Sequence, residues 1–143
     1  MALKKGVKQM VGEASAKITT LTVEEALKRL GDPDHVFVDI RDVRELEREG
    51  MIPDAFHAPR GMLEFWVDPE SPYHKDVFAS GKTFVFYCRS GWRSALATAA
   101  VQEMGLEPVP HRGRLRRLDG GQGAGGAAAA SGTQEGVSGE TDR

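Results

Sequence analysis

The sequence predicts an α/β fold in which helices cover both faces of a central, mostly parallel sheet. Short apolar runs of strand length alternate along the chain with longer segments that carry helix start and stop signals. Two of these runs, 36–40 and 83–87, are apolar at nearly every position, as is typical of parallel strands covered on both faces. The length of 143 residues suits a single domain with a modest core.

Composition narrows the function classes. A net charge of -2 with intermixed signs gives no indication of a nucleic-acid partner. The single cysteine, Cys88, excludes an intrachain disulfide and fits a reducing compartment. Residues 1–17 form a basic extension or helix without a continuous apolar stretch, so we expect no signal peptide, no membrane partner and a cytoplasmic location. We expect a monomer or a weak dimer.

The first elements are marked by the residues that flank them. Residues 3–11 can form a weakly amphipathic helix, and residues 18–21 a short strand. Thr22 is expected to cap a helix over 23–30, because Glu25 stands at the spacing of a capping box and Gly31 ends the segment. The apolar run 36–40 follows as a buried strand.

The middle of the chain is richer in charge and proline. Residues 41–49 are expected to form a helix with Val43 and Leu46 facing inward, and Gly50 ends it. Two prolines leave room for only a short strand within 52–59. Residues 61–66 suit a helical turn, and residues 68–72 a loop.

The strand 83–87 leads directly into the cysteine. A helix is expected over 92–104, ended by Gly105, and a last strand over 107–109. In parallel sheets of this kind, ligands bind at the carboxyl ends of the strands. Cys88 follows such an end, so the expected fold places the thiol where a site would form.

Cys88 has the surroundings of a nucleophile. Helix N-terminal amides and nearby cations, here Arg89 and Arg93, favour the reactive thiolate form of a cysteine. Gly91 can take backbone conformations that let successive N–H groups converge on an anion. The alternative is a small buried apolar residue, as most single cysteines are. The two arginines favour the nucleophile.

Two segments together resemble the rhodanese superfamily. Its first signature is matched by Asp39-Ile40-Arg41, Glu45, Gly50, Ile52-Pro53, Ala55 and Pro59, and its active-site loop by Cys88 through Ser94. The resemblance covers residues 18–109 and implies a three-layer, single-domain sulfurtransferase. Two positions depart from the signature, with Met51 in place of a histidine and Asp54 in place of a glycine.

The resemblance also implies a mechanism. The Cys88 thiolate would attack the outer sulfur of a donor such as thiosulfate, hold it as a persulfide and give it to a thiol, cyanide or protein acceptor. Backbone N–H groups would stabilise the anionic sulfur, while Arg89 and Arg93 orient the oxyanion end of the donor. The expected binding loop comprises Arg89, Ser90, Gly91, Trp92, Arg93 and Ser94. We expect no cofactor, and no metal, because the four histidines lack metal-ligand spacing.

Two other functions stay open. Related phosphatases and arsenate reductases place five residues between cysteine and arginine, whereas four residues separate Cys88 from Arg93. This shorter loop favours sulfur over phosphate. The second alternative is a non-catalytic binding module that recognises a protein through the loop or through Phe65 and Trp66.

The C-terminal segment does not fit the family pattern. From Gly120 onward Gly, Ala and Ser dominate and aromatic residues are absent, so we expect a domain over 18–111 that lacks its C-terminal helix, and a disordered tail over 112–143. Compatible codons for residues 111–119, shifted by one nucleotide, encode Ile-Glu-Gly-Gly-Phe-Gly-Ala-Trp, which resembles the missing ending. We therefore hypothesise a frameshift near residues 109–111, the alternative being a genuine basic linker and flexible tail.

Overall fold

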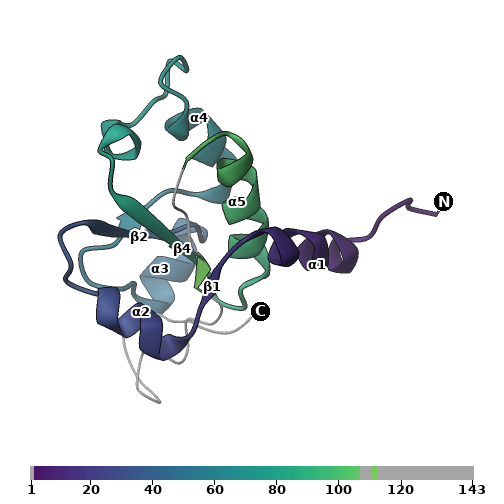
Figure 1. Cartoon of the computed structure of the whole chain (residues 1–143), viewed down its shortest axis with the longest axis horizontal. Helices are drawn as coiled ribbons and strands as arrows, with labels where there is room; N and C mark the ends of the chain where they lie inside the picture. Colours follow the sequence, from purple (N-terminus) through teal and green to yellow (C-terminus); the bar gives the residue numbers. More distant parts are fainter. Residues whose placement is uncertain (1, 107–110, 113–143) are drawn as a thin grey trace.

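The computed structural model describes residues 2–106 and 111–112, in which a parallel sheet lies between helices (Figure 1). The strands are β1 (Thr20–Leu21), β2 (His35–Asp39), β3 (Phe56–His57), β4 (Thr83–Tyr87) and β5 (His111–Arg112). The helices are α1 (Val7–Lys17), α2 (Val23–Arg29), α3 (Val43–Glu49), α4 (Leu63–Val67) and α5 (Trp92–Glu103), with short 3-10 turns η1 (Arg60–Met62) and η2 (Asp76–Ala79).

The strand order is β1-β5-β4-β2-β3, and each described pairing is parallel. β2 and β4 form the centre of the sheet, with Phe37 opposite Val85 and Val38 opposite Phe86. Parallel neighbours require crossover connections, which the intervening helices supply. The α/β fold with a parallel central sheet is therefore confirmed.

Separate apolar clusters cover the two faces of the sheet. One contains Val38, Phe84 and Phe86 and packs against residues of α4 and α5. The other contains Phe37, Val85 and Tyr87 and packs against Ala26 of α2. Because successive residues of a strand point to opposite faces, β2 and β4 need apolar residues at consecutive positions, and this explains the two continuous runs in the sequence.

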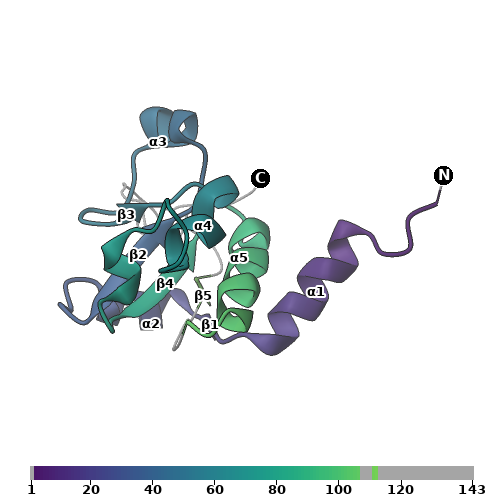
Figure 2. The same cartoon turned by 90° about the horizontal axis from the view of Figure 1, so that it is seen from above.

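Helix α1 extends away from the body of the protein, with only its C-terminal end beside α5 (Figure 2). Ala14 is buried there, and the Gln102 side-chain amide donates a 2.8 Å hydrogen bond to the Lys17 carbonyl oxygen. The expected helix over 3–11 is therefore shifted. Gly6 has an extended backbone, so the helix begins at Val7. The C-terminal half of α1 then lies against the domain.

Most other elements agree with expectation, and α3 gives the clearest correction. The capping box of Thr22 and Glu25 is confirmed at the start of α2. Helix α3 begins at Val43 with Asp42 as its cap, two residues later than expected. The prediction that Val43 faces inward is wrong, since its side chain is 52% exposed. Residues 76–79 form η2, for which the sequence analysis gave no element.

The C-terminal expectations fall mostly on undescribed positions. The expected strand over 107–109 lies outside the described residues, as does the expected tail apart from Arg112. The described strand β5 pairs Arg112 with Leu21 of β1. The sheet thus extends one residue past the expected domain end at His111.

Candidate active site

Cys88 follows β4 directly, at the carboxyl end of the central strand, and its side chain is fully buried. The next three residues turn the chain into α5, which starts at Trp92. Gly91 makes this turn with a φ of 93°, in the left-handed region that residues with a Cβ seldom occupy. The strand and the helix therefore meet at the sulfur, as the sequence predicted.

Backbone amides converge on the sulfur. The N–H groups of Gly91 and Ser94 donate to Cys88 Sγ at 3.2 and 3.3 Å, and the Ser94 Oγ lies 3.5 Å from it. Both amides belong to the N-terminal turn of α5, where N–H groups lack helical partners and the helix dipole favours negative charge. The loop thus has the geometry needed to hold an anionic sulfur.

Both loop arginines bind glutamates on α3. Arg93 donates to the two carboxylate oxygens of Glu45 at 2.8 and 3.1 Å. Arg89 forms an ion pair with Glu49. Their side chains remain 39% and 32% exposed, so they lie at the rim of the site. The expectation that the arginines orient an anionic donor stays a prediction, but each guanidinium already has a carboxylate partner.

A buried arginine links this rim to the core. The Arg41 guanidinium contacts the Asp39 carboxylate at 2.8 Å, with both side chains fully buried. It also donates to Glu49 at 3.0 Å and to the carbonyl oxygen of Gly50 at 2.7 Å. Asp39 and Arg41 thus form a fully buried ion pair. Through Arg41, the end of α3 has a fixed position relative to β2.

A second contact from β3 supports Arg41. The His57 Nε2–H donates a 2.8 Å hydrogen bond to the Arg41 carbonyl oxygen. His57 thus positions the backbone at the carboxyl end of β2.

The ion pair with Arg93 lowers the pKa of the Glu45 carboxyl group. Burial by itself would raise the pKa of this carboxyl group, but hydrogen bonding and the positive charge of Arg93 outweigh burial and lower the pKa. Burial correspondingly opposes the charged form of Arg93, yet hydrogen bonding to Glu45 raises its pKa above the ordinary value. Each partner stabilises the charged form of the other.

Two further loop residues, Ser90 and Trp92, contact each other. Trp92 is 46% exposed, and its backbone N–H donates to Ser90 Oγ at 3.4 Å. Phe65 and Trp66, the residues expected to bind a protein in the alternative function, do not lie together. Trp66 packs edge-on against Phe56 in the core, whereas Phe65 is exposed and packs against Tyr73.

The sequence analysis did not identify Glu45 and Glu49 as parts of the site. The two glutamates are four residues apart, and this spacing places them on the same face of a helix. It was the one indication in the sequence that they could act together.

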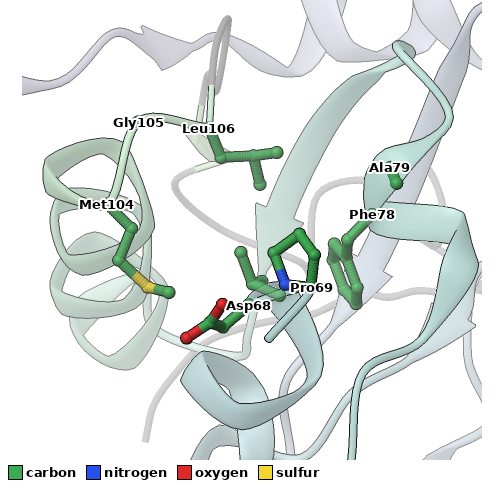
Figure 3. Close-up of a pocket in the computed structure, with 8 residues that line it drawn as sticks. Asp68, Pro69, Phe78, Ala79, Met104, Gly105 and Leu106 are labelled. Atoms are coloured by element: carbon green, nitrogen blue, oxygen red, sulfur yellow. The ribbon is translucent and has the colours of Figure 1, made fainter. Parts of the chain in front are cut away.

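The hollow drawn in Figure 3 lies away from Cys88. It has a volume of about 420 Å³ and is lined by residues that include Val67, Phe78, Met104 and Leu106. Met104 follows the last residue of the 12-residue helix α5, and a helix of this length spans about 18 Å. The hollow is therefore separated from the Cys88 loop by the length of α5.

Among residues 2–106 and 111–112, no group of three or more His, Cys, Asp or Glu side chains is arranged to hold a metal ion. Likewise, none of the described helices combines the length and apolar character needed to cross a membrane.

Several known proteins are similar to this chain in sequence or in fold. A sulfurtransferase from Allochromatium vinosum is 35% identical over 105 residues, covering 73% of this chain and 84% of its own. A solved structure from Rhodopseudomonas palustris, described as a protein of unknown function and possible tyrosine phosphatase, is 52% identical with a TM-score of 0.75, covering 79% and 87% of the two chains. The human single-domain sulfurtransferase TSTD1 has a TM-score of 0.55 at 23% identity and covers 66% of this chain and 88% of its own, which supports the fold alone.

The family model for the rhodanese-like domain matches residues 22–123. This match includes the strands β2, β3 and β4, the helix α3 with Glu45 and Glu49, and the Cys88 loop. The chain therefore belongs to the rhodanese-like domain family, which includes sulfurtransferases.

Proposed function

We propose that this protein is a sulfurtransferase that carries sulfur as a persulfide on Cys88, with thiosulfate as a donor. The observation that carries the proposal is the convergence of the Gly91 and Ser94 amides on Cys88 Sγ. A persulfide places a second sulfur, and its negative charge, at the end of the same side chain. Amides fixed by the fold stabilise such charge without reorganisation.

The loading step forms one sulfur–sulfur bond and breaks another. The Cys88 thiolate attacks the outer sulfur of thiosulfate, and sulfite leaves with the electron pair of the broken bond. The product is a Cys88 persulfide anion. Because Cys88 Sγ is fully buried in the described structure, loop residues must move before the donor sulfur can reach it.

The second step returns the enzyme to its starting form. A thiolate, cyanide or protein thiolate attacks the outer sulfur of the persulfide, and the Cys88 thiolate leaves with the electron pair. The acceptor gains one sulfur atom. Each step forms one bond to the transferred sulfur and breaks another, so the cycle balances without a cofactor.

Phosphate ester hydrolysis is a second candidate, because the Rhodopseudomonas palustris relative at 52% identity is described as a possible tyrosine phosphatase. A phosphatase needs cationic groups directed at the phosphate. The pairing of Arg93 with Glu45 and the four-residue spacing from Cys88 make sulfur transfer the better supported function.

Intact-protein mass spectrometry after incubation with thiosulfate tests the proposal. We expect the wild-type protein to gain the mass of one sulfur atom, located on Cys88, and to lose it when cyanide is added. Cys88→Ser should do neither. No mass gain in folded wild-type protein with either thiosulfate or an organic persulfide would disprove sulfur transfer, and release of phosphate from an aryl phosphate would favour the phosphatase.

A further inference from the structure

Helix α3 places two carboxylates beside the loop that holds the nucleophile. Glu45 binds Arg93 with both oxygens, and Glu49 binds Arg89 with one oxygen and Arg41 with the other. These contacts span 40 and 48 residues of sequence for the two loop arginines. The first and fifth residues after Cys88 are thus both held by α3.

The position of Glu49 is set from the core. It is the last residue of α3, and the following Gly50 ends the helix with a φ of 76° while its carbonyl oxygen accepts from Arg41. Arg41 is fully buried and paired with Asp39. Because the end of α3 is held in this way, Glu49 presents its second oxygen to Arg89 without needing a ligand to order it.

The ion-pair cluster balances its charges. It contains three cations and three carboxylates, which are Arg41, Arg89, Arg93, Asp39, Glu45 and Glu49. Two arginines near a thiol would by themselves attract dianions. Here a dianion must either approach two carboxylates or displace them from their arginines, and both routes oppose its binding.

We propose that Glu45 and Glu49 are specificity-determining residues that slow the loading of Cys88 from small dianionic donors such as thiosulfate relative to organic persulfides of low net charge. This inference rests on the proposed sulfur transfer at Cys88. The donor chemistry is then attack of the Cys88 thiolate on the outer sulfur of an organic persulfide in its neutral form. An organic thiolate leaves with the electron pair, and Cys88 keeps the transferred sulfur and its proton.

Glu49→Gln provides the sharpest test. The amide removes the negative charge from beside Arg89 but keeps an oxygen that can accept from Arg41. Glu47→Gln is the matched control, because Glu47 lies on the same helix, is exposed, and loses the same charge. Glu45→Gln is the second variant, so that the test still stands if Glu49→Gln fails to fold.

The measurement compares two donors under single-turnover conditions. The rate constants for loading Cys88 are determined by mass spectrometry for thiosulfate and for the persulfide of cysteamine, which reacts in its protonated persulfide form and carries an ammonium group in place of a second negative charge. We expect Glu49→Gln to raise the ratio of the thiosulfate rate constant to the cysteamine persulfide rate constant about tenfold at low salt. Glu47→Gln should change this ratio by less than about twofold. The gain should shrink as added salt screens the charges.

The outcomes separate this inference from the proposed function. If wild-type protein loads Cys88 but neither Glu49→Gln nor Glu45→Gln changes the ratio more than Glu47→Gln, the selectivity inference is wrong and sulfur transfer stands. If folded wild-type protein loads sulfur from neither donor, the proposed function fails and the selectivity inference fails with it. A ratio that rises equally in all three variants would indicate a general charge effect and would also overturn the inference.

Discussion

Arg93 on α5 and Glu45 on α3 are joined by two hydrogen bonds, with nitrogen–oxygen distances of 2.8 and 3.1 Å. The Glu45 side chain is only 17% exposed at this contact. The two residues are 48 positions apart in the sequence, and their pairing connects α5, which follows Cys88, to α3. It therefore affects both the stability of the site and its charge.

The first prediction concerns pH. Because Arg93 lowers the pKa of Glu45 in the folded state, this pair stabilises the protein fully above the unfolded pKa, about 4.3. That stabilisation is lost as the pH falls through the lower, folded pKa. Glu45→Gln should reduce the free energy of unfolding by about 1 kcal/mol at pH 7, allowing for solvent screening at Arg93, and by less at pH 3. Urea unfolding at both pH values measures this, and a deficit that is independent of pH would contradict it.

The second prediction concerns the buried charge of Arg41. Arg41→Met leaves the fully buried Asp39 carboxylate without its guanidinium partner. Removing one member of a buried ion pair costs about 3 to 5 kcal/mol, because the remaining charge is desolvated and uncompensated. Denaturant unfolding should detect this loss. As a control, Arg44→Met breaks an exposed pair with Asp42 and should cost less than about 0.5 kcal/mol; equal losses would refute the buried-charge explanation.

The third prediction concerns the loop glycine. Alanine at position 91 would have to adopt a φ near 93°, at a cost of about 1 to 2 kcal/mol for a residue with a Cβ. The strain is relieved if the turn opens, and this moves the Gly91 amide away from Cys88 Sγ. We expect lower stability together with slower persulfide formation. Gly12→Ala in α1 has the opposite expectation, a gain of about 0.5 to 1 kcal/mol, because Gly12 is helical and an added Cβ meets no atom within 4 Å.

The main elements of the fold could be predicted because their signals are local. Thr22 and Glu25 encode a helix start within four residues, and the continuous apolar run at 83–87 encodes a strand covered on both faces. The prediction for Val43 is wrong because the pattern of residues 41–49 indicates a helix packed on the core. In the structure α3 has no fully buried residue, and Glu45 and Glu49 bind the two arginines of the Cys88 loop.

The site could be predicted only in part. Cys88 and its loop form one contiguous segment, so its position after a strand and before a helix was sufficient to locate it. Glu45 and Glu49 reach the loop across 40 or more residues, and a charged stretch such as 41–49 resembles an ordinary solvated helix face. Which arginine each carboxylate meets depends on how α3 is held by Arg41, and this is a property of the tertiary structure.

The last prediction concerns Asp54, which has a φ of 67° although it is not a glycine. The Ala55 amide donates to the Ile52 carbonyl oxygen at 3.1 Å, so Pro53 and Asp54 occupy the central positions of a β-turn. A turn with proline followed by a residue of positive φ is of type II, in which glycine is favoured at the second position. Asp54→Gly should therefore raise the free energy of unfolding by about 1 kcal/mol.

Asp54→Ala separates backbone conformation from charge at this turn. Alanine removes the same carboxylate but meets the steric cost of a positive φ, so this variant should be no more stable than the wild-type protein. Both variants can be measured by thermal and urea unfolding. If alanine stabilised the protein as much as glycine, removal of the charge would be the cause. Greater stability of the glycine variant alone would mean that Asp54 holds a strained position for which a glycine is better suited.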